Sequence, residues 1–394
     1  MIGKAGEDDG MIYLDNISGT PLHAEVRAAM VAYMEDGFGN PISQHRAGDE
    51  ALETLERARE DVAGLIGANK TEIVFTSGGT ESINQAVKGA AAAVGEKGRH
   101  IVTSNIEHQA VLRSLRALTR MGYRVTSVPV DEHGLVDPAD VEKAVTDETI
   151  LVSIMHANNE IGTVEPIGEI AGITRKRGVL LHTDAVASAG VVPVDVEALG
   201  IDLLSMAANQ FYGPSGVGAL FVRTGVKIAP LLDGGIQEGG LRAGTQNMIG
   251  IVGMGKAAQL AKREMSGRME HLLNLKKMFI ERIAEIDETL INGHPVKSLP
   301  HLVSCSVRYV EGESMVLLLD EEGICASTRS ACATGSLRAS HVLTSIGRDY
   351  TTTQGTVIFS FGIQNTRDDV AASSAAFKRA VDFLRSMSPL YHKK

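Results

Sequence analysis

The stretch LLSMAANQFYGPSGVG, residues 203–218, has the pattern of two buried strands joined by a turn. Residues 203–206 form an apolar run, a turn rich in glycine and proline follows, and residues 217–222 form a second apolar run. Strand pairs of this kind often present a catalytic side chain at the turn. Here the turn holds Asn209 and Gln210, and neither amide has a pKa near neutrality, so neither can act as an acid, a base or a nucleophile.

On the N-terminal side of this stretch, short apolar runs alternate with segments of helical periodicity. The alternation predicts a mostly parallel sheet that is buried on both faces, because strands separated by helices are joined by right-handed crossovers. The expected strands are residues 73–75, 100–104, 123–130, 149–155 and 179–183. One helix is expected to begin near Ile83, and three more are expected at residues 110–121, 138–145 and 167–176.

The two flanks of this region predict further elements. Residues 11–14 predict a short strand, and Thr20 with Pro21 predicts a helix start, since threonine is a common N-cap and proline suits the first helical position. After a loop at residues 37–48, residues 49–65 predict an amphipathic helix that ends before Gly67 and buries Leu52, Leu55, Val62 and Leu65. The C-terminal part predicts a helical segment at residues 250–286 and a smaller α/β unit that ends in a helix at residues 368–387.

The composition indicates a soluble globular protein. The chain has 394 residues, of which 44% are hydrophobic, so we expect two or three domain-sized units with a substantial core. A net charge of −10 without a basic block argues against a nucleic-acid partner. No apolar run is long enough to span a membrane and no N-terminal signal pattern is present, which predicts a cytoplasmic location; the polar residues 1–10 are expected to be flexible.

Several polar residues near expected strand ends could bind a ligand. The sequence SGGTES, residues 77–82, is a glycine-rich turn before a helix and suits an anion such as phosphate, although turns of this composition are often purely structural. Asp184 could pair with a cationic ring nitrogen or form a turn, and His108 could stack on a ring or cap a helix. Asn158 and Asn159 could hydrogen-bond a ligand or only shape a turn.

The three cysteines of the chain differ in their surroundings. Cys332 lies in CASTRSACATGSLRASH, residues 325–341, which we expect to be an exposed loop. Its thiol is therefore a candidate nucleophile or soft-metal ligand, with an inert thiol as the alternative. Cys325 follows an apolar run and Cys305 alternates within VSCSV, so both are expected to be packed. An odd number of cysteines without CxxC spacing argues against a disulfide framework.

Several blocks of the sequence resemble the signature blocks of cysteine desulfurases of the NifS/IscS class. They are HANNEIGTVEPI (156–167), HTDAVASAG (182–190), FYGPSGVGALFVR (211–223), LRAGTQN (241–247) and SACATGSLRASHVL (330–343). The resemblance implies the α/β fold of fold-type I pyridoxal-phosphate (PLP) enzymes and a homodimer with each active site at the dimer interface. It implies a large domain at residues 20–260 around a mostly parallel sheet of the seven-stranded type, and a smaller α/β domain made of residues 11–19 and 261–394.

The resemblance also assigns roles to residues that match the family's blocks. In that family PLP forms a Schiff base with a lysine, and a loop cysteine takes the sulfur from the substrate cysteine. Cys332 matches this sulfur-accepting cysteine. The matching cofactor contacts are Thr80 at the phosphate, His108 stacked on the ring, Asn159 near cofactor and substrate, Asp184 at the ring nitrogen, and Thr245 at the phosphate of the other subunit.

The same blocks depart from the family pattern at positions that should converge on one pocket. The family reads Ser-x-His-Lys where residues 207–210 read Ala-Ala-Asn-Gln. The replacements are Gln210 for the Schiff-base lysine, Asn209 for its neighbouring histidine, Ala207 for a phosphate-binding serine, Ala187 for a glutamine near the PLP hydroxyl, and Ile363 for the arginine that holds the substrate carboxylate.

These departures predict that the chain does not release sulfur from cysteine by the PLP route, because an amide cannot form an imine or shuttle a proton. We therefore expect a desulfurase-like protein of iron–sulfur cluster assembly that partners an IscU-type scaffold. Cys332 would serve as a metal ligand to a shared cluster, with 2Fe-2S as the expected type, or as a sulfur relay. The alternatives are a PLP enzyme with a non-covalently held cofactor, an active cysteine desulfurase and a purely structural subunit.

Overall fold

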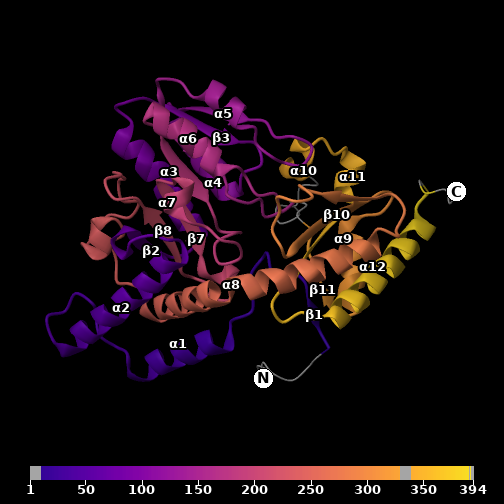
Figure 1. Cartoon of the computed structure of the whole chain (residues 1–394), viewed down its shortest axis with the longest axis horizontal. Coiled ribbons are helices and arrows are strands. Elements are labelled where there is room, and N and C mark those ends of the chain that lie inside the picture. The colour runs from indigo at the N-terminus through magenta and orange to yellow at the C-terminus, as the bar shows by residue number, and fades with distance from the viewer. Residues whose placement is uncertain (1–9, 329–338, 390, 392–394) are drawn as a thin grey trace.

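The computed structural model describes residues 10–328, 339–389 and 391 (Figure 1). Its largest sheet has seven strands in the order β2-β8-β7-β6-β5-β3-β4. Strands β3 to β7 pair in parallel and β8 is antiparallel to both of its neighbours, so the predicted mostly parallel sheet is confirmed. The strands span Ile73–Thr76 (β2), His100–Ser104 (β3), Arg124–Val128 (β4), Thr149–Ser153 (β5), Leu180–Asp184 (β6), Leu203–Ala207 (β7) and Gly218–Val222 (β8).

The stretch 203–218 forms the predicted pair of strands. Strands β7 and β8 are antiparallel, with Ala207 opposite Gly218, and the short 3-10 helix η2 (Ala208–Gln210) begins the turn between them. Gly218 is needed where β8 passes the turn at Gly78, because a Cβ atom at position 218 would lie 2.7 Å from the Cα atom of Gly78. The turn that holds Gln210 therefore lies at the carboxyl end of β7, beside the ends of the parallel strands.

Helices cover both faces of this sheet. On one face, α3 (Gly79–Val94) and α4 (Gln109–Arg120) pack on strand residues that include Val74 and Leu203. On the opposite face, the strand residues include Phe75 and Leu204. The helices there are α2 (Arg46–Leu65), α5 (Pro138–Ala144), α6 (Ile167–Arg177), α7 (Val196–Leu199) and α8 (Met248–Ile283). Successive strand residues thus face opposite helical layers, as a doubly covered parallel sheet requires.

The C-terminal part of the chain builds a second, antiparallel sheet with its own core. Its strand order is β12-β10-β9, with β9 at Thr289–Asn292, β10 at Leu302–Val307 and β12 at Thr356–Ser360. Helices α9 (Gly312–Glu321) and α12 (Arg367–Met387) pack on it. A parallel pair of β1 (Ile12–Tyr13) and β11 (Ile324–Cys325) brings the N-terminal segment to the same region. The limits of the two predicted domains stay a prediction.

Helix α8 is 36 residues long and contributes to both cores (Figure 1). Met254 in its first half packs under the seven-stranded sheet, and Phe279 in its second half packs on the antiparallel sheet. Between them, Arg268 pairs with Glu264 at 2.8 Å, and its guanidinium lies 5.2 Å from the ring centroid of Tyr212. Tyr212 belongs to the turn between β7 and β8, so α8 contacts both cores and this turn.

The predicted helix start at Thr20 and Pro21 is wrong. Helix α1 spans Ala24–Asp36, and the imidazole of His23 is its N-cap. Thr20 is instead bound to the turn after β7. Its backbone N–H donates to the carbonyl of Asn209 at 2.8 Å, and its hydroxyl oxygen accepts from the backbone N–H of Tyr212 at 2.7 Å. A side chain that satisfies a distant turn is not available to cap a local helix.

Two further helices begin earlier along the chain than expected. Helix α2 starts at Arg46, inside the expected loop, because His45 caps it. Helix α3 starts at Gly79, directly in the glycine-rich turn, rather than near Ile83. Leu52, expected on the buried face of α2, is 43% exposed.

The remaining elements are short. They are η1 (Lys70–Glu72), η3 (Gln237–Gly240), α10 (His341–Ser345) and α11 (Tyr350–Gln354). Within the described ranges, no helix combines the length and the apolar character needed to cross a bilayer.

Candidate functional site

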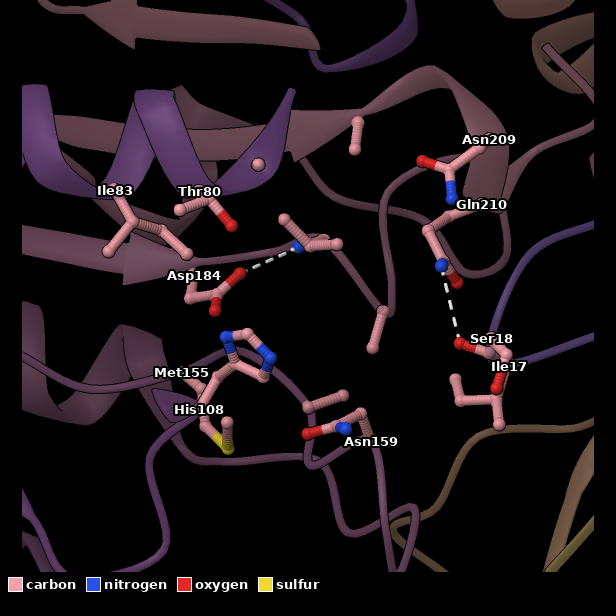
Figure 2. Close-up of a pocket in the computed structure, with 15 residues that line it drawn as sticks. Ile17, Ser18, Thr80, Ile83, His108, Met155, Asn159, Asp184, Asn209 and Gln210 are labelled. Atoms are coloured by element: carbon pink, nitrogen blue, oxygen red, sulfur yellow. Dashed lines mark hydrogen bonds between the residues drawn. The ribbon is translucent and has the colours of Figure 1, made fainter. Parts of the chain in front are cut away.

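A pocket of about 340 Å³ lies at the carboxyl ends of β5, β6 and β7 (Figure 2). Open α/β sheets commonly bind ligands at this edge, because the loops that follow the strands converge there. The first turn of α3 and His108, the N-cap residue of α4, also border the pocket. Its polar lining residues are Ser18, Thr80, His108, Asn159, Asp184, Asn209 and Gln210.

Gln210 lines the pocket from the turn after β7 and is only 8% exposed. Its Nε2 atom donates to the carbonyl of Ile17 at 3.2 Å (Figure 2). Ile17 and Ser18, from the N-terminal segment, line the same pocket. The amide of Gln210 therefore binds this segment to the strand end, in the place where the resemblance expects a cofactor-bearing lysine.

Asp184 and His108 are the titratable side chains that line the pocket. Asp184 ends β6, is 5% exposed, and accepts from the backbone N–H of Val186 at 3.0 Å. Burial raises the pKa of the Asp184 carboxyl above its ordinary range, and the nearby His108 opposes this shift. Figure 2 shows the His108 ring directly beside the Asp184 carboxylate. A cation placed next to Asp184 would favour its ionised form.

The N-cap role of His108 fixes which ring nitrogen carries the proton. Its Nδ1 atom accepts from the backbone N–H of Ala110 at 3.1 Å at the start of α4. In the neutral ring the proton must then be on Nε2. For both residues the sequence left a structural role and a ligand-binding role open. The two roles do not exclude each other, because His108 caps a helix and Asp184 shapes a turn while both side chains line the pocket.

Thr80 lies in the first turn of α3, after the glycine-rich turn. The turn is braced by Glu81, which accepts from the backbone N–H of Ser77 at 2.7 Å and pairs with Arg242 at 2.9 Å. Gly79 lies against the loop after β6, since a Cβ atom there would be 2.6 Å from Cγ2 of Val186. The first turn of a helix presents N–H groups and a partial positive charge, which suits an anion beside Thr80.

The two adjacent asparagines have different environments. Asn158 is fully buried, and its Oδ1 atom accepts from the backbone N–H groups of Glu160 and Ile161 at 2.8 and 3.0 Å. Its Nδ2 atom donates to the carbonyl of Ile106 at 2.9 Å. Asn159, by contrast, lines the pocket. Asn158 therefore shapes the turn, and Asn159 has access to a ligand.

The described lining fits PLP in part. The buried carboxyl of Asp184 suits a cationic ring nitrogen, and the N-terminus of α3 with Thr80 suits a phosphate. Among the described residues that line the pocket, however, there is no lysine or arginine. The residues present therefore fit a cofactor that is held without a covalent bond, and they do not fit one attached through an amine.

Other residues singled out in the sequence lie elsewhere. Thr245 is exposed and does not line this pocket. Its expected contact with the cofactor phosphate in the pocket of a second subunit stays a prediction. Ile363 is bound to the turn after β7 by its backbone N–H, which donates to the hydroxyl of Tyr212 at 2.8 Å. Cys332 lies outside the described residues. The roles assigned to all these side chains stay predictions.

Some pocket residues were missed in the sequence. Ile17 and Ser18 lie between the expected strand at residues 11–14 and the expected helix start at Thr20, and Met155 reads as one more apolar residue at a strand end. Glu107, which directly precedes His108, is fully buried. Glu107 does not line the pocket itself, and its only signal in the sequence is that it directly precedes His108.

The seven-stranded sheet, the second sheet and a pocket at the strand ends define the fold-type I class of PLP enzymes. The family model described as "Aminotransferase class-V" matches residues 12–372. The chain belongs to this family, within its IscS/NifS cysteine desulfurase branch.

Individual relatives resemble the chain over almost its whole length. A cysteine desulfurase IscS of Dictyoglomus turgidum is 48% identical over 379 residues, which cover 96% of each chain. One of Methanosarcina thermophila is 48% identical over 383 residues, covering 97% of this chain and 95% of that protein. A solved NifS-like protein has a TM-score of 0.89 at 37% identity, covering 95% of this chain and all of that one. The predicted fold class is confirmed.

Proposed function

We propose that this chain is a desulfurase-like protein that serves iron–sulfur cluster assembly without releasing sulfur from cysteine through covalently held PLP. The observation that carries the proposal is the environment of Gln210. It occupies the strand end that faces the pocket, and its amide is bound to the carbonyl of Ile17. An amide nitrogen is neither basic nor nucleophilic, so no covalent attachment can form there.

The proposed loss of activity extends beyond attachment. Ile363, which replaces the substrate-binding arginine, has no charge to hold a carboxylate. A charge-assisted hydrogen bond contributes about 1.5–3 kcal/mol, so losing a bidentate pair weakens binding of an amino-acid substrate substantially. Ala207 and Ala187 line the pocket with methyl groups where polar donors are expected. The changes together remove attachment, phosphate donors and substrate capture.

The pocket residues that remain can still bind and orient a ring. Bound PLP would supply an electron sink. Asp184 would hold its ring nitrogen, His108 would stack on the ring, and Thr80 with the N-terminus of α3 would bind its phosphate. Nothing in this set can replace the missing amine, so we infer a ligand-binding role for the pocket at most.

The thiol chemistry of the chain supports Cys332 as the functional cysteine. Cys305 is fully buried in β10, and burial raises the pKa of its thiol to about 12. Burial and the nearby carboxylates of Asp320 and Asp15 also raise the pKa of Cys325. Metal ligation and sulfur transfer both need a thiolate, which neither residue supplies readily near neutral pH.

The flanks of the segment that carries Cys332 approach the pocket region. Ser327 exchanges two backbone hydrogen bonds with Ile358, at 2.8 and 3.1 Å. On the other flank, the hydroxyl of Ser340 donates to Glu160, which is next to the pocket residue Asn159. We infer that an IscU-type scaffold holds a 2Fe-2S cluster through three cysteines and that Cys332 supplies the remaining ligand. The alternative is that Cys332 relays sulfur to the scaffold. In both cases we expect a homodimer of this chain to bind the scaffold.

Anaerobic co-purification of the chain with an IscU-type scaffold, followed by iron and sulfide analysis, tests this proposal. We expect the wild-type complex to bind iron and sulfide and the Cys332→Ala complex to bind much less. Cys325→Ala is the matched control and should behave as the wild type. Equal iron and sulfide in the Cys332→Ala complex would refute the ligand role. A persulfide on Cys332, formed when polysulfide is supplied as the sulfur donor and detected by mass spectrometry, would favour the relay instead.

A second candidate is a PLP enzyme, because the relatives named cysteine desulfurase are 48% identical to this chain and Asp184, His108 and Thr80 line one pocket. This candidate predicts a visible cofactor band in the purified protein and sulfide release from cysteine when PLP is added. Sulfide release that is lost on substitution Asp184→Asn would contradict the inactive assignment, whereas a cofactor band alone would show only that PLP binds. A purely structural subunit would show neither activity nor any effect of Cys332→Ala on a complex.

A further inference from the structure

Glu107 is a buried carboxyl behind the pocket, in the connection between β3 and α4. Its Oε1 atom accepts from the hydroxyl of Ser104 at 2.6 Å and from the backbone N–H of Met155 at 3.0 Å. The carboxyl thus ties the end of β3 to the segment that follows β5. Its neighbour His108 and its partner Met155 both line the pocket. Moving Glu107 would therefore move two walls of the pocket.

The backbone of Glu107 also binds helix α10. The Nε2 atom of His341, the first residue of that helix, lies 3.0 Å from the carbonyl oxygen of Glu107. A carbonyl only accepts, so this nitrogen carries the proton. Ser340 caps the helix and donates to Oε2 of Glu160 at 2.5 Å. Two hydrogen bonds therefore fasten the start of α10 to the segments that carry His108 and Asn159.

An apolar cluster completes this attachment. Val342, Leu343 and Ile346 are at most 3% exposed and pack against Ile106, Met155 and Ile161. Helix α10 belongs to the C-terminal part of the sequence, yet its apolar contacts are with the loops of the seven-stranded sheet. Met155 contacts this cluster and also lines the pocket.

Glu107 is a poor choice for stability alone. Its Oε2 atom is buried and has no hydrogen-bond partner among the described residues. Burial raises the pKa of the carboxyl to about 8, so it is neutral near pH 7. A buried polar atom without a partner costs about 1–3 kcal/mol, which an apolar side chain would avoid. Its contacts with Ser104, Met155 and His341, rather than its burial, point to a positioning role.

We propose that Glu107 is a positioning residue that couples helix α10 to the pocket. A ligand that binds against His108 would change how firmly α10 is attached to the loops of the seven-stranded sheet, and the attachment of α10 would in turn change the affinity for the ligand. The two effects must be equal in free energy, because coupling between two sites is reciprocal. The proposal rests on the proposed function only in taking PLP as the probe ligand.

Hydrogen exchange and ligand titration test this coupling. In the wild type, PLP should slow exchange of the Thr344 and Ile346 amides in α10, which bond to Ser340 and Val342. His341→Ala, which removes the contact with the Glu107 carbonyl, should weaken PLP affinity about tenfold, or about 1.4 kcal/mol. Glu107→Gln keeps the Oε1 acceptor and should stay near wild type, whereas Glu107→Ala should match His341→Ala.

Glu165 provides the matched control. It is also a buried carboxyl whose pKa is raised to about 8, and it accepts from the backbone N–H of Val136 rather than contacting α10. Glu165→Gln should leave the PLP affinity and the exchange of α10 unchanged. A loss of affinity in this variant equal to that of His341→Ala would mean that general destabilisation, not coupling, explains the result.

A readout without ligand separates this inference from the cofactor question. The imidazole NMR signals of His108 should shift in His341→Ala, although His341 contacts the chain at Glu107 and not at the ring. If PLP does not bind the wild type, the second candidate function fails while these signals still judge the coupling. Unchanged His108 signals in both His341→Ala and Glu107→Ala would overturn it.

Discussion

At the scale of single residues, the proposal that this chain does not attach PLP covalently rests on Gln210. The side chain is held at the pocket wall by one hydrogen bond to the carbonyl of Ile17. The pocket around it has a buried carboxyl at Asp184 and, at His108, a histidine that caps helix α4. The proposed loss of covalent attachment therefore rests on an amide at a position where an amine would be needed.

Gln210→Lys should restore covalent attachment of PLP. The lysine would project from the same strand end into the same pocket, and attachment requires only an amine in reach of the cofactor aldehyde. After borohydride reduction, mass spectrometry should find the cofactor mass on residue 210. Gln210→Met, of similar length without an amine, is the control and should carry no such mass. Absence of the modification in the lysine variant would show that the pocket no longer admits PLP.

At the scale of elements, regular strands could be predicted and long-range contacts could not. The runs at residues 73–75 and 149–155 are largely apolar because both faces of the sheet are buried, so each of these strands has a local signal. Thr20 has no such signal. Its partners Asn209 and Tyr212 are 189 and 192 residues away along the chain, and only the folded chain shows that they bond to its hydroxyl.

The candidate site divides in the same way. Thr80, His108 and Asp184 were singled out because each follows or precedes a predicted element, and the resemblance named roles for them. The residue pattern could not separate Asn158 from Asn159, since the difference is the direction of two adjacent side chains in one turn, and only the resemblance assigned Asn159 to the cofactor. It also could not reveal Met155, whose position between the pocket and α10 depends on three segments of the fold.

Thr20→Val should destabilise the turn after β7 while leaving α1 in place. The substitution removes the hydroxyl that donates to Asn209 at 3.0 Å and accepts from Tyr212 at 2.7 Å, at nearly constant volume. A loss of about 1–3 kcal/mol in the free energy of unfolding is expected from urea titration. Thr20→Ser retains the hydroxyl and should lose less. Equal losses in the two variants would assign the effect to the methyl group instead.

At the scale of the whole molecule, buried carboxyls make stability depend on pH. Burial raises the pKa of Glu165 in the folded chain to about 8, against an ordinary value of 4.5. Between these values the folded state binds more protons than the unfolded state. Stability from this group is therefore fully present below about pH 4.5 and is lost as the pH rises through 8.

Glu165→Gln should flatten this dependence. The amide oxygen can still accept from Val136, but no ionisation opposes folding as the pH rises. Unfolding free energies measured in urea at pH 5.5, 6.5 and 7.5 should fall less steeply for the variant. The difference in slope should approach one proton, about 1.4 kcal/mol per pH unit. Parallel slopes for the two proteins would show that Glu165 is ionised in the folded state.

Helix α8 has a mechanical consequence for the whole molecule. At 1.5 Å per residue, its 36 residues form a rod about 54 Å long that is anchored in both cores. A continuous helix has no flexible hinge between the two cores, so rotation of one sheet relative to the other must bend the helix. Arg268, near the middle of the helix, lies on Tyr212. Bending of α8 would therefore displace Arg268 and, through Tyr212, the turn that holds Gln210. The shape of the pocket would then depend on how stiff this helix is.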